Sequence, residues 1–202
     1  LNSVGGMCNA GTLLAVGFEG QPPDKRKALE FYLQSAKLNS AGAMYNAGIL
    51  FAEGFEGQAP DKSRALGLYL QAAKLNDSYS MFRAGILLSE GFEGQAPDKR
   101  RALRLYLKAA ELNHARAMYN AGTFLMQSYS GDESVLKQAK DLFSRSAARG
   151  ISLSMVQLGR LYLGEFSPKW ADLEKALFWL ERAKSLNDPW AAKYLEKATQ
   201  YA

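Results

Sequence analysis

Residues that most often carry out chemistry are scarce in this chain. Its 202 residues contain one histidine, His114, and one cysteine, Cys8. His114 has no Ser, Cys or metal-ligand companion at a recognisable spacing, so we interpret it as a surface or turn residue rather than a catalytic base. A lone cysteine excludes an internal disulfide framework and a cysteine-based zinc site. The sequence therefore predicts no catalytic residue, no metal site and no cofactor.

Two short patterns resemble catalytic ones, but each has a simpler interpretation. The glycine-rich stretch 17–20 (GFEG) carries a Glu where a phosphate cradle uses backbone amides and a Lys, so we predict a turn. Recurring Asp-Lys pairs such as Asp24-Lys25 stand where a helix should begin, which suits N-capping better than acid–base catalysis. We therefore predict that the protein is not an enzyme and has no small-molecule substrate.

The dominant feature of the sequence is an internal repeat of 37 residues. In five copies, Met stands four residues before a repeated glycine and Ala stands 17 residues after it. A period of this length is typical of a solenoid, in which each unit buries its apolar face against its neighbours. The repeated glycines are Gly11, Gly48, Gly85, Gly122 and Gly159. Because a glycine inside a helix costs about 1 kcal/mol relative to alanine, their repetition predicts close contacts between helix backbones.

Each copy is expected to form two antiparallel helices. In the first copy, apolar and small residues spaced by three and four predict a helix over residues 4–16, and Gly17 ends it. Asp24 is the predicted N-cap of a second helix over residues 25–38. Asn39 is the predicted stop, since Asn tolerates a left-handed backbone. The predicted fold class is all-α, a solenoid of five helix pairs.

The repeat predicts one elongated domain over residues 1–202. Its copies span about 4–40, 41–77, 78–114, 115–151 and 152–188, and a C-terminal capping helix covers 189–202. Asp188 and Pro189 suit the start of that helix. In copy four the Pro-Asp pair of copies one to three is missing, so Asp132 or Ser134 must cap the second helix, and its loop is the expected irregular spot. The start at Leu1, without an N-terminal capping helix, suggests a fragment of a longer chain.

A family resemblance rests on a series of motifs. Copy two carries residues 43–48 (AMYNAG), Gly54, Gly57, residues 61–65 (DKSRA), Tyr69 and residues 72–73 (AA). With this series the copies resemble the Sel-one-like repeat, a relative of the tetratricopeptide repeat. They depart from its pattern by an Ala in place of Leu before the glycine in copies one to four, and by the altered loop of copy four. The resemblance implies a right-handed superhelix of antiparallel helix pairs that binds proteins, often as an adaptor in a larger complex, without shared catalytic residues.

The same resemblance implies a concave groove lined by the first helices. The residues just before the glycines would face it as two columns, one mostly of amides and one largely aromatic. Amides can pair with peptide groups, and aromatic rings give contact area at low entropy cost. The alternative is that the aromatic column is core and that the Asn side chains bond neighbouring loops. The amide column is Asn9, Asn46, Arg83, Asn120 and Gln157; the other holds Tyr45, Phe82 and Tyr119 between Cys8 and Val156; Tyr79 and Arg116 are candidate rim contacts.

A second candidate surface is basic and begins the second helices of copies one to three. Positive side chains at the start of a helix interact unfavourably with the helix macrodipole, so another interaction should stabilise them there. An acidic partner, a phospholipid or RNA would supply one, but a solvated face paired with Glu19, Glu56 and Glu93 is the simpler interpretation. We call this surface the basic ridge: Lys25, Arg26, Lys27, Lys62, Arg64, Lys99, Arg100 and Arg101.

The composition leaves three functions open. The net charge of +5 arises from 25 basic and 20 acidic residues spread along the chain, without the clustering of a strong nucleic-acid binder. We favour a scaffold or adaptor that holds a protein segment or subunit surface in its groove. The alternatives are a nucleic-acid or anionic-membrane binder that uses the basic ridge, and a structural spacer in a large assembly. The partner and the compartment stay unknown, although a lone cysteine favours a reducing intracellular one.

Overall fold

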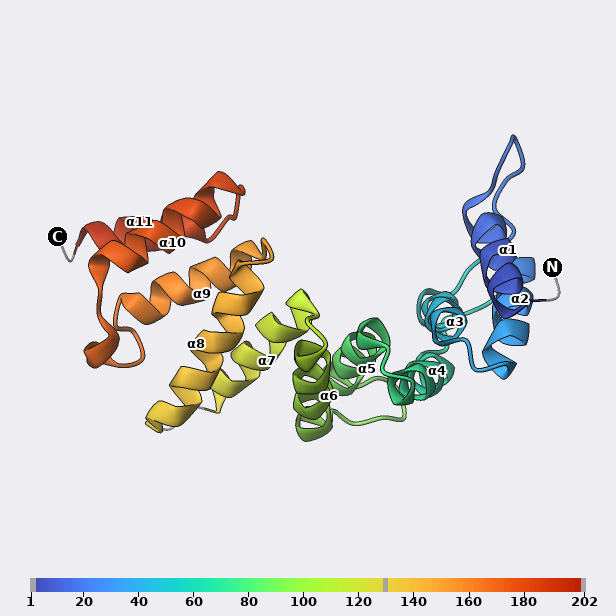
Figure 1. The fold of residues 1–202 in the computed structure, drawn as a ribbon, viewed down its shortest axis with the longest axis horizontal. Coiled ribbons are helices and arrows are strands. Elements are labelled where there is room, and N and C mark those ends of the chain that lie inside the picture. The colour runs from blue at the N-terminus through green and yellow to red at the C-terminus, as the bar shows by residue number, and fades with distance from the viewer. Residues whose placement is uncertain (1–2, 129–130, 201–202) are drawn as a thin grey trace. The chain divides into compact units, whose positions relative to one another are not determined.

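The computed structural model describes residues 3–128 and 131–200, and within these ranges every regular element is a helix (Figure 1). The all-α prediction is thus confirmed. None of the described helices is long and apolar enough to cross a bilayer. The helices are α1 Val4–Val16, α2 Lys25–Lys37, α3 Ala41–Glu53, α4 Lys62–Lys74, α5 Ser78–Glu90, α6 Lys99–Glu111, α7 Ala115–Gln127, α8 Glu133–Ala147, α9 Ser152–Tyr162, a 3-10 turn Pro168–Trp170, α10 Leu173–Ser185 and α11 Ala191–Thr199.

Side-chain caps begin most of these helices; among the described elements α9, α11 and the 3-10 turn have none. The predicted cap Asp24 accepts a hydrogen bond from the amide of Lys27 at 2.9 Å, and Asp61 and Asp98 repeat this contact in copies two and three. In copy four the cap is Asp132 rather than Ser134, and the predicted irregular loop before it includes residues 129–130, which lie outside the described residues. Each cap satisfies an amide that has no partner inside its helix.

The loops are closed by backbone hydrogen bonds that recur with the period of the sequence. In copies one, two, three and five the amide of the aspartate cap donates to a carbonyl near the end of the preceding helix, as from Asp24 to Leu14 at 2.7 Å and from Asp98 to Leu88 at 2.7 Å. Between the two helices of a pair, Phe18 and Gln21 form a short bridge that copies two and three repeat. The predicted stop Asn39 has a φ of 62°, in the left-handed region. These local contacts join the two helices of a pair in the same way in successive copies.

The helices form two compact units, Leu1–Leu112 with α1 to α6 and Asn113–Ala202 with α7 to α11. In the first unit each helix packs against the next one in the chain (Figure 1). In the second unit the same order holds, and α11 also contacts α9. Each unit is therefore a solenoid of stacked helix pairs.

The repeated glycines pack as closely as predicted, but against side chains rather than mainly against backbone. A Cβ at Gly48 would lie 2.5 Å from Cε1 of Tyr69, and one at Gly85 would lie 2.5 Å from Cε1 of Tyr106. In every copy the partner stands 21 residues after the glycine, on the second helix of the same pair. A flat aromatic ring thus fills the space above the glycine in copies one to four, and a leucine fills it in copy five. The partners are Tyr32, Tyr69, Tyr106, Phe143 and Leu180.

The C-terminal capping helix starts later than the sequence suggested. α11 begins at Ala191, and residues 201–202 at its predicted end lie outside the described residues. The Asp188 carboxylate accepts a hydrogen bond from the amide of Trp190 at 3.0 Å, and the Asp188 carbonyl accepts one from Ala191 at 3.3 Å. Asp188 therefore holds a turn ahead of the helix instead of capping its first residue, and this turn presents the Trp190 side chain.

Candidate functional site

In the first unit, three of the predicted groove residues lie together. The ring of Tyr45 is 6.1 Å from that of Tyr79, with an interplanar angle of 63°, and 6.1 Å from that of Tyr69. Burial would lower the pKa of Arg83, but its hydrogen bond to the Tyr45 side chain leaves that pKa raised overall. Arg83 thus stays charged beside aromatic rings. Phe82 is half-buried, with its ring 6.1 Å from Tyr106.

The amide column has more internal contacts than predicted. Burial raises the pKa of the Tyr32 hydroxyl, whereas the side chains of Thr12 and of the half-buried Asn46, a residue of the next copy, each lower it. Tyr32 donates a hydrogen bond to Thr12 at 3.2 Å. The Asn46 side chain thus lies beside Tyr32 of α2, a helix of the preceding copy, rather than beside a neighbouring loop. Asn9 is exposed and Asn120 is half-buried.

In the second unit, the first helices line a hollow of about 310 Å³. Three residues of the predicted groove columns line it, namely Tyr119 from α7 and Val156 and Gln157 from α9. The prediction missed Leu153 and Trp190, which are 38% and 50% exposed. These two follow the rim candidates Tyr79 and Arg116 at the repeat spacing, so extending that column would have found them. The lining is Tyr119, Leu153, Val156, Gln157, Arg160, Trp190 and Tyr194.

Arg160 forms the polar wall of this hollow. Its Nε donates to Oε2 of Glu165 at 2.8 Å and its Nη1 donates to Oε1 of Gln157 at 3.1 Å. The guanidinium also lies 5.3 Å from the ring centroid of Tyr194. Lys197 donates to the other oxygen of Glu165 at 2.7 Å. Burial tends to raise the pKa of Glu165, but the hydrogen bonds from Lys197 and Arg160 bring it below its ordinary value.

The residues of the basic ridge are all exposed, but their pairing differs from the prediction. Lys27 forms an ion pair with Asp24 at 3.1 Å and Arg64 forms one with Asp61 at 3.4 Å. Within the described residues the ridge forms no ion pair with Glu19, Glu56 or Glu93. The predicted pairing with these glutamates was wrong because each cap aspartate stands three residues before its cation. Side chains three residues apart lie on the same face of a helix and meet there.

Two hollows lie beside the ridge, each between the loops of consecutive copies. One of about 900 Å³ includes Phe18, Arg26 and Phe55, and the second, of about 590 Å³, includes Lys62 and Phe92. Their edges carry both signs of charge, since Asp24, Glu56, Asp61 and Glu93 also line them.

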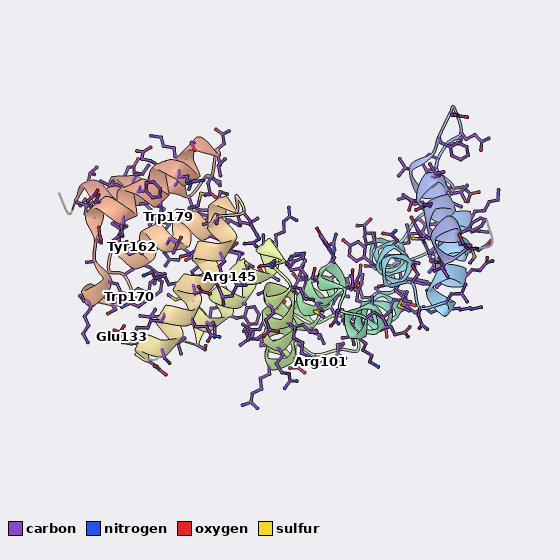
Figure 2. The ribbon with its side chains drawn as sticks, in the orientation of Figure 1. Arg101, Glu133, Arg145, Tyr162, Trp170 and Trp179 are labelled. Carbon is purple, nitrogen blue, oxygen red and sulfur yellow. The ribbon has the colours of Figure 1, made fainter. Side chains whose placement is uncertain are left out.

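In copies four and five the loop end is tied together by side chains instead. Nε1 of Trp170 and the hydroxyl of Ser167 donate to the two carboxylate oxygens of Glu133, at 2.8 and 3.1 Å. Lys140 lies 5.1 Å from the ring centroid of Trp170 and 5.5 Å from that of Tyr162. Figure 2 labels Glu133, Tyr162 and Trp170 on this side of the unit. The altered loop sequences of these copies therefore serve packing.

His114 lies at the predicted turn but is buried rather than at the surface, and it is the N-cap of α7. Its Nδ1 accepts a hydrogen bond from the amide of Ala117 at 3.2 Å. Ser3, Ser40 and Asp77 occupy the same position in earlier copies and make the same contact. Among the described residues no group of three His, Cys, Asp or Glu side chains could hold a metal ion.

Stacked helix pairs with a repeat of 37 residues define a helical-repeat solenoid protein. The sequence profile of the Sel1 repeat matches residues 5–40, 41–77, 78–114, 115–151 and 152–188. The chain therefore belongs to the Sel1 repeat family. Proteins of this family are commonly protein–protein interaction scaffolds and are generally non-enzymatic.

Solved structures share the fold. A protective antigen of uropathogenic Escherichia coli with an SLR fold is 26% identical, with a TM-score of 0.79; the match covers 90% of this chain but 38% of that one. A Sel1 repeat protein from Oxalobacter formigenes is 23% identical, with a TM-score of 0.76, and the match covers 100% of this chain and 89% of the other. This chain thus spans well under half of the Escherichia coli protein. A comparison with curated protein sequences finds no match.

Proposed function

We propose that this chain is a scaffold or adaptor that holds a protein segment, or a subunit surface, in the groove along its first helices. The observation that carries the proposal is the hollow of the second unit, which α7, α9 and the start of α11 line together. Its lining combines exposed apolar side chains with a few polar ones. This composition is typical of binding sites, in which apolar area gives affinity and a few polar groups fix orientation.

The spacing of the groove suits an extended peptide. Neighbouring packed helices lie about 10 Å apart, and an extended chain rises about 3.3 Å per residue. One repeat would therefore contact about three ligand residues. The aromatic cluster of Tyr45 and Tyr79 with Arg83 offers a second contact area on the first unit, because Tyr and Arg are enriched among residues that dominate binding energy.

The basic ridge supports a second candidate function, the binding of nucleic acid or an anionic membrane. Its exposed cations favour this, but six carboxylates stand beside its eight positive side chains. A polyanion binder gains affinity by neutralising many phosphates, so interspersed carboxylates weaken it. The carboxylates are Glu19, Asp24, Glu56, Asp61, Glu93 and Asp98.

Crosslinking with mass spectrometry in native extract tests the two surfaces. The wild type is compared with an Asn46→Ala, Asn120→Ala variant in the groove and a matched Lys62→Ala, Arg100→Ala variant on the ridge. We expect a partner segment to crosslink near the first helices and to be weakened by the groove variant alone. Crosslinks confined to Lys25, Lys62 and Lys99, with binding that falls steeply with salt, would reject the groove in favour of the ridge.

The function as a spacer is tested by the same variants. If neither pair of substitutions alters any protein contact of the chain, the solenoid holds its neighbours apart without a groove ligand, and the proposal fails.

A further inference from the structure

The hollow of the second unit has an apolar floor and an apolar edge. Val156 forms part of the floor and is 3% exposed. Leu153 and Trp190 stand at its edge with large exposed fractions, and neighbouring exposed apolar side chains with polar groups around them often mark an interaction site. A single large apolar side chain from another molecule would complete this packing.

The charge around the hollow is mostly positive. By the repeat spacing, Arg116 falls in the column of Leu153 and Trp190, and Lys193 falls in the column of Tyr119 and Val156. Arg160 and Lys197 each pair with Glu165. α7 and α9 contain no acidic residue. Glu196 of α11 stands at the position of the repeated glycines, which faces the second helix of a pair rather than the groove.

Two of these cations are available to a ligand. Arg160 and Lys197 are held by Glu165. Arg116 is exposed and makes no hydrogen bond, ion pair or ring contact within the described residues, and the ammonium group of Lys193 lies 5.6 Å from the ring centroid of Trp190 as its one such contact there. Arg116 stands 37 residues before Leu153, and Trp190, whose ring Lys193 contacts, stands 37 residues after it. One cation therefore flanks Leu153 on each side, about one repeat away.

From this arrangement we infer that the hollow binds an extended acidic segment of a protein through one large apolar side chain, such as Leu or Phe. Carboxylates about three residues before and after that side chain would pair with Arg116 and Lys193, because one repeat spans about three extended residues. The inference rests on the proposed function and names the ligand class for the same groove. An apolar anchor with a carboxylate on each side distinguishes this ligand from a nucleic acid.

Fluorescence anisotropy on the whole 202-residue chain tests the inference. The probe is a fluorescein-labelled peptide with the core Asp-Ser-Ser-Leu-Ser-Ser-Asp. Matched peptides replace Leu by Ala, or both Asp by Lys. We expect saturable binding of the first peptide at concentrations below about 1 mM. Each replacement should weaken binding about tenfold or more, since both the anchor and the charges contribute.

Two protein variants with equal charge change locate the site. Arg116→Glu should weaken the acidic peptide about tenfold, whereas Arg100→Glu on the ridge should leave binding unchanged. Leu153→Asp should weaken it as well, and circular dichroism should show the wild-type helix content for all three.

Several results would overturn the inference. The inference fails if the Lys peptide binds as tightly as the Asp peptide, or if Arg116→Glu and Arg100→Glu weaken binding equally. It also fails if binding does not saturate below about 1 mM, or if oligothymidylate with the same total charge displaces the peptide. If the peptide fails but a native partner crosslinks to the first helices, the groove function stands and this ligand class is wrong. If crosslinks lie on the basic ridge, both proposals fail.

Discussion

The same buried serine position is hydrogen-bonded in copy five but, in the part of the chain that the structure describes, unpaired in copy three. In the second unit, Ser154 donates to Ser146 at 2.7 Å, and Ser146 donates to the carbonyl of Ala115 at 2.9 Å. Ser80 stands at the position of Ser154 in copy three, but the residue that would face it is Ala72. Ser80 is fully buried and its hydroxyl has no hydrogen-bond partner within the described residues. An unpaired buried hydroxyl carries a desolvation cost.

Replacing these serines should therefore have opposite effects. We expect Ser80→Ala to raise the free energy of unfolding by about 1 kcal/mol, and Ser154→Ala to lower it by about 1 kcal/mol. Urea denaturation followed by circular dichroism measures both. A Ser80→Ala variant that unfolds at lower urea than the wild type would contradict the packing described above.

Glu165 should make stability depend on acidity. Its pKa is lower in the folded protein than its ordinary value, which is about 4.3. The folded state therefore binds this proton less readily than the unfolded state, and the stabilisation is present above about pH 4.3 and is lost as the pH falls through the folded pKa. We expect Glu165→Gln to lower the free energy of unfolding at pH 7 by about 1–3 kcal/mol and to flatten its fall below about pH 4. Chemical denaturation at a series of pH values measures this, and Glu196→Gln is the exposed control on α11.

At the scale of the helix, glycines with different surroundings should respond differently to alanine. A Cβ at Gly67, on α4, would meet no atom within 4 Å, whereas one at Gly48 would overlap the buried ring of Tyr69. We expect Gly67→Ala to stabilise by about 0.5–1 kcal/mol through helix propensity, and Gly48→Ala to destabilise by about 1–3 kcal/mol through overpacking. Urea midpoints of the two variants test this, and a shift in the same direction for both would refute it.

The first turn of α7 depends on a side chain that rarely caps helices. We expect His114→Ala to lower the free energy of unfolding by about 1 kcal/mol, because the amide of Ala117 loses its acceptor. His114→Ser should retain most of the stability, since Ser40 makes the same contact in copy two. Thermal unfolding of both variants measures the difference; an equal loss would show that packing of the imidazole matters more than the cap.

At the scale of the whole molecule, the division into two compact units predicts that a destabilising substitution in one unit unfolds that unit without unfolding the other. Contacts are concentrated within Leu1–Leu112 and within Asn113–Ala202, and solenoid repeats are stabilised by nearest neighbours. We expect Gly48→Leu to remove hydrogen-exchange protection from the amides of copies one to three while residues 113–200 keep theirs. Exchange measured by mass spectrometry tests this, and a uniform loss along the chain would show that the units unfold together.

The repeat by itself determined the all-α fold, the helix pairs, the aspartate caps and the left-handed Asn39, because each depends on residues within a few positions of one another. Tertiary structure decided the rest. The rings above the glycines, the pairing of Arg83 with Tyr45 and the hollow beside Leu153 and Trp190 depend on side chains from different helices. The period shows that such columns exist, but the space between them is set by the size of every packed neighbour, and at Trp190 by the turn that Asp188 holds before α11.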